Sequence, residues 1–424
     1  MENKILLVSV NMGYGHQRTA FPLKKFAYEN RIINANDYNG MSKKDRAVWE
    51  NSKKFYEFVS RFKRVPLLGG AVFSIFDKFQ KIEDFYPKRN LSSPNFMTKK
   101  VYRLFKKGWG KDFIKQFDCS LPMVSTFFIP AFMAEFFDYK GDIFCVVCDA
   151  DISRSWAPLI PQKSRIKYLV PNLWTLKRLK MYGVKEENIF LTGYPLPLEN
   201  IGDEKMEVLK KDIAFRLLNL DKEGEYRKKN NNFIFEKIES FPKEERYNLT
   251  IAFSIGGAGA QKEIALKMIK GISEEIKKKE ISIVIMAGIR EKVRDFFAKE
   301  LNSLGLLSEN VKIVYSEKIE EYFTKFNKEI RKTDILWTKP SELSFYCALG
   351  LPIIIAPPLG SQEDFNKKWL LKMGAGISQE NPLYFKEWLF DYLKSGRFAQ
   401  CAINGFTLSE KMGTLNIEKI CRLK

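Results

Sequence analysis

One histidine occurs in the 424 residues of this chain, and it lies where a side chain could do chemistry. His16 closes the segment 11–16, Asn-Met-Gly-Tyr-Gly-His, directly after the apolar run 5–10. A strand that leads through glycines into a helix presents backbone N–H groups on a concave surface. Imidazole is the side chain best suited to move protons near neutral pH. This placement predicts an active site at the turn, although such a histidine can also merely hydrogen-bond the backbone.

A second glycine turn opens the other half of the chain in the same way. Residues 254–260, Ser-Ile-Gly-Gly-Ala-Gly-Ala, come at the end of the apolar run 249–254. Small residues let backbone N–H groups approach a diphosphate, and the following helix adds the positive end of its dipole. A basic residue after the next apolar run could reach the same group. The candidate diphosphate ligands are Gly256, Gly257, Gly259 and Arg290.

Strand-like apolar runs alternate with helix-like segments through both halves. The runs are 5–10, 123–128, 143–148, 166–170 and 189–192, and then 249–254, 281–287, 311–314, 335–337 and 352–356. Alternation of this kind implies parallel sheets covered by helices. We therefore predict an α/β fold of two Rossmann-like domains that face each other across a cleft, with ligands at the carboxyl ends of strands.

The same alternation predicts the domain boundaries. The first domain should span residues 1–198 and the second residues 249–395. Residues 199–248 are rich in Lys, Glu and Asn, and we interpret them as a partly helical connecting insertion. Residues 396–424 should form a helical tail that could pack back on the first domain.

The chain is strongly basic, and the excess is local. Lys and Arg number 71 against 51 Asp and Glu, which gives a formal charge of +20. Residues 43–115 hold 19 basic and 7 acidic residues. Such a field attracts anionic lipid, nucleic acid or phosphorylated ligands. No nucleic-acid-binding motif accompanies it, so we expect no nucleic-acid partner.

Within this region, residues 48–86 are the best candidate for contact with a membrane. A helix with a basic face is followed by residues 65–76, which carry no charge. Such a pair of segments would lie in a headgroup layer, although ordinary core helices with solvated basic faces show the same pattern. No apolar run approaches the length of a membrane span, and no signal peptide is recognisable.

The six cysteines and the scattered carboxylates give no metal-ligand spacing, so we expect no metal. Cys145 and Cys148 are three apart on a predicted strand and would point to opposite faces. We interpret the cysteines as reduced thiols of a cytoplasmic protein.

Three more segments complete a known pattern. They are 191–197 (Leu-Thr-Gly-Tyr-Pro-Leu-Pro), 338–342 (Thr-Lys-Pro-Ser-Glu) and 358–366 (Pro-Leu-Gly-Ser-Gln-Glu-Asp-Phe-Asn). In this combination the chain resembles the glycosyltransferases related to monogalactosyldiacylglycerol synthase, the bacterial diacylglycerol glucosyltransferases and, more distantly, the transferase that makes lipid II. The resemblance runs from the first strand to about residue 380, apart from the insertion.

This resemblance implies the GT-B fold. It also implies inverting transfer of a sugar from a nucleotide donor, usually UDP-linked, to a lipid acceptor at the cytoplasmic membrane surface, without a catalytic metal or a bound cofactor. The partners would be the nucleotide sugar, the lipid acceptor and an anionic membrane, with the protein peripheral at the inner face. The first domain would then lie on the acceptor side, with residues 43–115 facing the membrane, and the second would bind the donor.

The resemblance assigns individual residues to a predicted site. Gly13, Gly15 and His16 match the loop beside the acceptor, and Gly256, Gly257 and Gly259 match the loop that cradles the donor diphosphate. Gln362 and Glu363 match the pair that holds the sugar hydroxyls. Asn366 matches the Asn of the same donor-side segment.

Transfer needs a base, because the acceptor hydroxyl must lose its proton as it attacks the anomeric carbon. Asp149 ends a predicted strand and Trp156 lies seven residues on, an arrangement similar to that of related lipid glycosyltransferases. Asp149 and His16 are both candidates for the base. Asp151 lies two residues from Asp149, so one of the two aspartates could be a helix cap instead.

The chain also departs from the family pattern. Lys339-Pro-Ser-Glu342 replaces the usual Lys-Pro-Gly-Gly, so an acidic residue comes earlier than expected. Glu342 could bind ribose hydroxyls or complement a helix dipole. Two alternatives therefore stay open: a glycosyltransferase with a non-lipid acceptor, or an inactive protein that binds nucleotide sugar or membrane.

Overall fold

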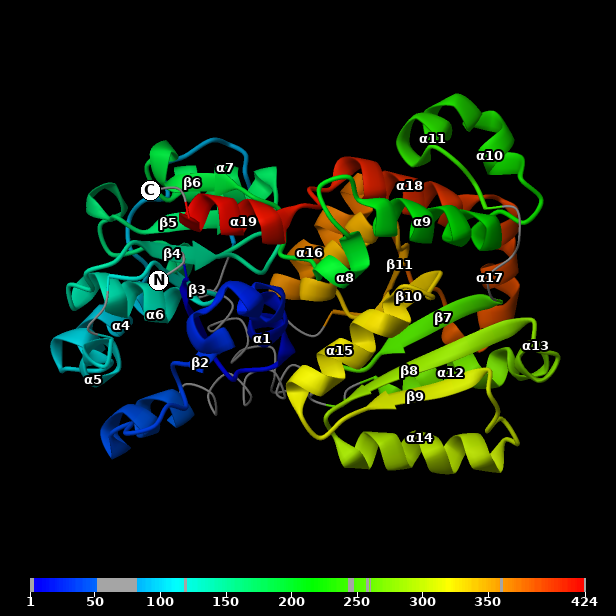
Figure 1. Ribbon diagram of the computed structural model, residues 1–424, viewed down its shortest axis with the longest axis horizontal. Coiled ribbons are helices and arrows are strands. Elements are labelled where there is room, and N and C mark those ends of the chain that lie inside the picture. The colour runs from blue at the N-terminus through cyan, green and yellow to red at the C-terminus, as the bar shows by residue number, and fades with distance from the viewer. Residues whose placement is uncertain are drawn as a thin grey trace. The chain divides into compact units, whose positions relative to one another are not determined.

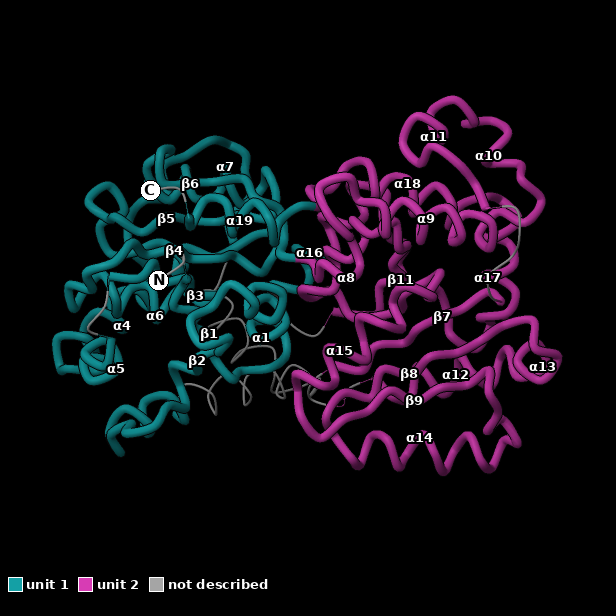
Figure 2. The backbone as a smooth tube through the Cα atoms, viewed as in Figure 1, with its two compact units in different colours: residues 1–195, 359–366, 412–424 teal, residues 196–358, 367–411 magenta. Residues whose placement is uncertain are grey.

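Two units make up the chain, and each is described here by itself. The computed structural model describes residues 4–51, 82–117, 120–242, 248–256, 259, 261–358 and 361–422. Unit 1 comprises residues 1–195, 359–366 and 412–424, and unit 2 comprises residues 196–358 and 367–411 (Figure 2).

Unit 1 is built on a parallel six-stranded sheet with the order β2-β1-β3-β4-β5-β6 (Figure 1). Its strands are β1 (Leu6–Ser9), β2 (Ile33–Asn34), β3 (Met123–Ser125), β4 (Ile143–Val146), β5 (Lys167–Val170) and β6 (Ile189–Leu191). Leu7 of β1 pairs with Val124 of β3, which pairs with Phe144 of β4. Every residue of β1, β3 and β4 is buried, as expected of strands covered on both faces.

Unit 2 has a second parallel six-stranded sheet with the order β12-β11-β10-β7-β8-β9. Its strands are β7 (Leu249–Ser254), β8 (Ile281–Gly288), β9 (Val311–Tyr315), β10 (Ile335–Thr338), β11 (Ile353–Ile355) and β12 (Gly376–Ser378). The two sheets, with helices between their strands, confirm the predicted α/β class and its two Rossmann-like halves.

Helices connect the strands in both units. The α-helices of unit 1 are α1 (Tyr14–Ala20), α4 (Phe96–Lys106), α5 (Lys111–Lys115), α6 (Phe128–Phe136), α7 (Leu173–Met181) and α19 (Gly413–Arg422). Those of unit 2 are α8 (Leu198–Ile201), α9 (Glu207–Leu220), α10 (Glu225–Lys229), α11 (Asn231–Ile238), α12 (Lys262–Gly271), α13 (Ser273–Lys277), α14 (Glu291–Ser303), α15 (Ile319–Ile330), α17 (Phe385–Lys394) and α18 (Arg397–Leu408). Helix α16 (Ser361–Met373) begins in unit 1 and ends in unit 2.

The helix that follows the first glycine turn is short and is continued by a tighter turn. Helix α1 begins at Tyr14 and ends at Ala20, and a 3₁₀ helix, Phe21–Phe26, follows it. Pro22 explains the change, because proline has no N–H for the α-helical bond to residue 18 and its ring crowds that carbonyl.

The insertion 199–248 holds helices, and α9 is anchored within unit 2. Arg216 of α9 is buried to 1% exposure, and its guanidinium donates to the carbonyl oxygens of Thr333 at 2.8 Å and Leu349 at 2.6 Å. A buried guanidinium is tolerated only when its N–H groups find such acceptors. Helix α9 is therefore an integral layer of unit 2.

The last helix, α19, closes the core of unit 1. Its Ile417 and Cys421 pack with Leu7, Val124 and Phe144 of the sheet in one buried cluster. The start of the helix lies against the turn after β6, since a Cβ added to Gly413 would lie 2.1 Å from the carbonyl oxygen of Tyr194. Glycine is therefore required at that position.

Among the residues that the structure describes, none of the helices combines the length and apolar character needed to cross a membrane. Most of the segment 48–86, which we expect to meet a membrane, lies outside the described residues, which resume at residue 82.

Candidate functional site

The chain direction in the first sheet brings His16 to a topological switch point. From β1 the chain continues to β2 on one side, whereas from β3 it continues to β4 on the other, so the connections that leave these two paired strands run in opposite directions. Ligands of open parallel sheets bind at such a point, beyond the carboxyl ends of the strands. His16 follows β1, Thr126 follows β3, and the His16 Nδ1 lies 2.9 Å from the Thr126 carbonyl oxygen.

The contact with Thr126 fixes the tautomer of His16. A carbonyl oxygen only accepts hydrogen bonds, so Nδ1 must carry the proton and Nε2 the lone pair. The Cys148 Sγ also approaches Nδ1, at 3.4 Å. The imidazole ring lies 4.7 Å from the Phe127 ring between centroids and 6.5 Å from that of Trp156. His16 is thus a partly buried imidazole whose orientation is set by its Nδ1 contact.

Asp149 belongs to the loop that follows β4, directly after the cysteine that His16 contacts. It is partly buried. Asn366 of α16 donates from Nδ2 to Asp149 Oδ1 at 3.2 Å, and its own Oδ1 accepts the Ala150 N–H at 2.7 Å. The structure therefore brings together, within unit 1, the predicted residues His16, Asp149 and Asn366.

Asp151 has a structural role. Its carboxylate forms a two-pronged ion pair with Arg178 of α7, at 2.9 and 2.8 Å, and both side chains are fully buried. One oxygen also accepts the Ile152 N–H at 2.9 Å. Burial raises the pKa of the Asp151 carboxyl, and Arg178 offsets part of this shift. Asp149, with its partial exposure, is the aspartate of this loop that a substrate could reach.

Trp156 and the glycines of the first turn shape the surroundings of His16. Trp156 is 2% exposed and packs 5.1 Å from Phe128 between ring centroids, so it forms a wall rather than an open stacking surface. Gly13 is the N-cap of α1, with φ of +90°, a conformation that favours glycine. The Gly15 carbonyl accepts a hydrogen bond from Thr19 at 2.8 Å.

A switch point also organises the candidate residues of unit 2. The chain passes from β7 to β8 and β9 on one side and then returns to β10 on the other. Gly256 follows β7 and Lys339 follows β10. A Cβ added to Gly256 would lie 3.1 Å from Lys339 Cε, so the lysine side chain passes over this glycine.

The rest of the second glycine turn is tight and carries a second cation. The Gly259 N–H donates to the Gly256 carbonyl oxygen at 2.7 Å, and Gly259 has φ of +70°. Its ideal Cβ position lies 3.9 Å from Arg290 Cδ, and Arg290 itself is exposed. Gly257 lies outside the described residues. The structure therefore places Gly256, Gly259, Arg290 and Lys339 around one turn.

Glu342 begins a 3₁₀ helix, Glu342–Leu349, where sequence reasoning expected the start of a helix. It is 8% exposed. Gln362 and Glu363 lie in the first turn of α16 and are partly buried. These two belong to unit 1, whereas Gly256, Gly259, Arg290 and Glu342 belong to unit 2.

Three neighbours of the site were not among the predicted site residues: Thr126, Cys148 and Lys339. Each directly follows or nearly follows a strand end, which is the one property that could have pointed to them. Over the described part of the chain, no group of three or more His, Cys, Asp or Glu residues is placed to hold a metal ion.

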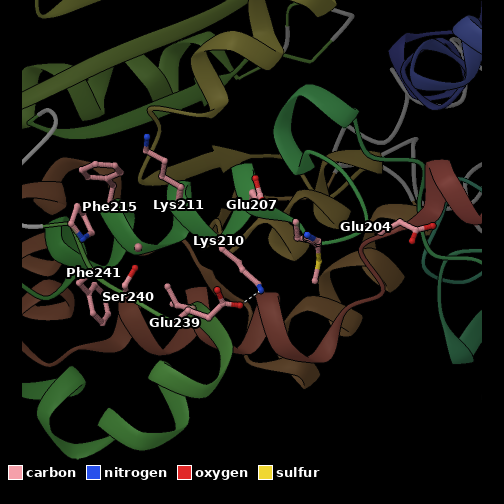
Figure 3. A pocket seen from close by; sticks show the side chains of 13 residues that line it. Glu204, Glu207, Lys210, Lys211, Phe215, Glu239, Ser240 and Phe241 are labelled. Atoms are coloured by element: carbon pink, nitrogen blue, oxygen red, sulfur yellow. Dashed lines mark hydrogen bonds and ion pairs between the residues drawn. The ribbon is translucent and has the colours of Figure 1, made fainter.

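Residues of the insertion 199–248 line a pocket in unit 2 (Figure 3). It lies between α9 and residues 238–242, with the aromatic rings of Phe215 and Phe241 at one end, and an ion pair joins Lys210 to Glu239 across it. None of the predicted site residues lines it.

Sequence comparisons with known proteins give one partial match and one negative result. A family model described as "Domain of unknown function (DUF6938)" matches residues 242–328. A search of curated proteins finds no match to the chain.

Three solved structures illustrate the similarity of fold. UDP-GlcNAc 2-epimerase from Neisseria meningitidis, bound to UDP-GlcNAc, is 12% identical with a TM-score of 0.46, covering 98% of both chains. MurG from Acinetobacter baumannii is 12% identical with a TM-score of 0.44, covering 76% of this chain and 77% of its own. Anabaena HepE, in complex with UDP and glucose, is 10% identical with a TM-score of 0.43, covering 99% and 98%. At TM-scores below 0.5, these similarities assign no role to any residue.

Proposed function

We propose that this protein is a glycosyltransferase that moves a sugar from a UDP-linked donor to a lipid acceptor at the cytoplasmic face of a membrane. The observation that carries the proposal is the oriented imidazole of His16 beside the Asp149 loop, at the switch point of the first sheet. The glycine turn with Lys339 and Arg290, at the switch point of the second sheet, supplies the matching donor-side chemistry.

In the proposed reaction, the acceptor hydroxyl attacks the anomeric carbon and gives its proton to Asp149 or to His16 Nε2. The bond between that carbon and the diphosphate oxygen breaks, and UDP leaves with the electron pair. Such a single displacement inverts the anomeric centre. It needs no metal if backbone N–H groups and cations stabilise the leaving diphosphate.

The donor residues follow from the same scheme. Gly256, Gly257 and Gly259 would present backbone N–H groups to the diphosphate, and Arg290 would meet its charge. Lys339 is added to this set because of its position over Gly256. The remaining donor-side candidates are Glu342 for ribose hydroxyls and Gln362 and Glu363 for the sugar.

The membrane part of the proposal rests on the described end of the basic region. Residues 96–117 expose seven cations and a single acidic residue, Asp112. The cations are Lys99, Lys100, Arg103, Lys106, Lys107, Lys111 and Lys115. None of the seven forms an ion pair within the residues that the structure describes, and Phe96 is 52% exposed at the start of α4. Unpaired cations beside an exposed aromatic ring suit an anionic headgroup layer.

The first experiment is a donor screen with purified protein, UDP-hexoses and a membrane lipid extract, in which UDP release is measured with and without lipid. Lipid-dependent release with one donor is the expected result, and Asp149→Asn should reduce it about 100-fold or more while UDP still binds. Release that does not depend on lipid would point to a non-lipid acceptor or to hydrolysis. Binding of UDP without any release would favour a non-catalytic binding protein.

A further inference from the structure

Asn366 reaches from α16 to the loop that carries Asp149. It is 1% exposed, and both heteroatoms of its amide contact this loop. Oδ1 accepts the backbone N–H of Ala150 at 2.7 Å, and Nδ2 donates to Asp149 Oδ1 at 3.2 Å. The partners lie more than two hundred residues away in sequence but in the same unit.

The backbone of this loop is fixed by other groups. The carbonyl oxygen of Ala150 accepts hydrogen bonds from Asn172 Nδ2 and Thr175 Oγ1, each at 3.1 Å. The next residue, Asp151, is locked by its buried ion pair with Arg178. Asn366 thus adds one backbone contact to a loop that is already held at several points, and it alone among these groups donates to the Asp149 side chain.

A donor at one carboxylate oxygen has two effects that matter for a base. It restricts the rotation of the carboxylate, so the second oxygen points in a defined direction. It also favours the ionised form, because the amide N–H stabilises negative charge. A general base must be both ionised and aimed at the proton that it removes.

We propose that Asn366 is a positioning residue that holds the Asp149 carboxylate ionised and oriented for the transfer reaction. This inference rests on the proposed function and changes the role of Asn366 from donor ligand to support of the base.

Helix α16 also links Asn366 to the two predicted sugar ligands, Gln362 and Glu363. Gln362 and Glu363 precede Asn366 by four and three residues on α16, so they share one side of the helix with it. At about 1.5 Å per residue, the two predicted sugar ligands lie about 4.5 and about 6 Å along the helix from Asn366. In the proposed function, helix α16 would therefore set the spacing between the sugar ligands and the residue that holds Asp149.

The decisive variant is Asn366→Asp. It retains an oxygen for the Ala150 N–H and replaces the amide donor by an oxygen that faces Asp149. Two adjacent carboxylates do not both ionise readily, so the acidic limb of the kcat–pH profile should move up by about 1 to 2 pH units. At pH 7 this shift alone changes kcat little, but the Asp149 carboxylate is no longer oriented, so we expect kcat there to fall about 10-fold, with KM for the UDP-sugar within about threefold.

Two further variants distinguish the loss of positioning from a loss of folding stability. Asn366→Ala removes the donor without adding charge and should lower kcat about 10-fold. Asn219→Asp in unit 2 is the matched control, because Asn219 is buried and donates from Nδ2 to Asp334 Oδ2 at 3.0 Å. The control should lose thermal stability to a similar degree but keep the wild-type pH profile.

The outcomes separate this inference from the proposed function. If Asp149→Asn is inactive while Asn366→Asp keeps the wild-type profile, or raises KM alone, the positioning role is wrong and the function stands. If the wild type transfers no sugar, the proposed function is wrong. The effect of Asn366 on the Asp149 carboxyl can then still be measured by a carboxyl NMR titration of Asp149. An upward shift of its titration in Asn366→Asp supports the positioning role, and an unchanged titration overturns it.

Discussion

His16 is held at one nitrogen, and this decides which of its atoms can take a proton. Because Nδ1 donates to the Thr126 carbonyl, the ring keeps one orientation and one tautomer. The roles of His16 and Asp149 can be separated by a substitution that keeps a donor near the position of Nδ1 and removes Nε2.

Asn at position 16 has an amide donor near the place of Nδ1 and nothing at the place of Nε2. We expect His16→Asn to unfold within a few degrees of the wild type and to bind UDP normally. If Nε2 is the base, kcat should fall about 100-fold or more. The measurement is turnover beside calorimetric UDP binding, with Cys148→Ser as the control for the neighbouring contact at 3.4 Å. Activity within threefold of the wild type would remove His16 from the candidates and leave Asp149.

At the scale of elements, the pair of Asp151 and Arg178 fastens the loop after β4 to α7. Both side chains are fully buried, and Arg178 also lies 4.1 Å from the ring of Phe85. Removing one partner of such a pair leaves a buried charge without compensation.

We therefore expect Asp151→Asn to lower the free energy of unfolding by about 3 kcal/mol, as measured by urea denaturation. Asp149→Asn, two residues away, should change it by less than about 1 kcal/mol, because that side chain is partly exposed. The two variants should thus have opposite profiles, one unstable and the other stable but inactive. Equal stabilities would contradict the assignment of Asp151 as the structural aspartate.

The longer strands were predictable because each is a buried apolar run between turn residues. β2 and β12 were not predicted, since Ile33–Asn34 and Gly376–Ser378 are too short to give such a run. The end of α1 at Ala20 was not predicted, although Pro22 in the sequence accounts for it. The glycine turns and His16 were found because their residue types are unusual at those positions.

The contacts that complete the site could not be predicted in the same way. The hydrogen bond between Asn366 and Asp149 joins α16 to the β4 loop, and no local pattern encodes such a pairing. The same holds for His16 with Cys148 and for Gly256 with Lys339. The last two pairs arise because parallel strands bring their carboxyl ends to one edge of a sheet.

At the scale of the whole molecule, the uneven charge is the property with the clearest consequence. The net charge of +20 is concentrated in the first half of the chain, and residues 96–117 expose part of it as cations without acidic partners among the described residues. Each cation close to an anionic membrane surface contributes about 1 kcal/mol to binding, and salt screens this attraction.

Replacing Lys99, Lys100, Arg103 and Lys106 by Gln should therefore weaken binding to vesicles with anionic lipid by about 4 kcal/mol, or roughly a thousandfold. Vesicle sedimentation at low and high salt measures this, and wild-type binding should fall as salt rises. The matched control replaces four exposed lysines of unit 2, Lys222, Lys292, Lys299 and Lys328, by Gln. Both variants lose the same net charge. If residues 96–117 form the membrane-binding surface, the control should therefore bind like the wild type. Equal loss in both would mean that overall charge, rather than the α4–α5 surface, attracts the protein to the membrane.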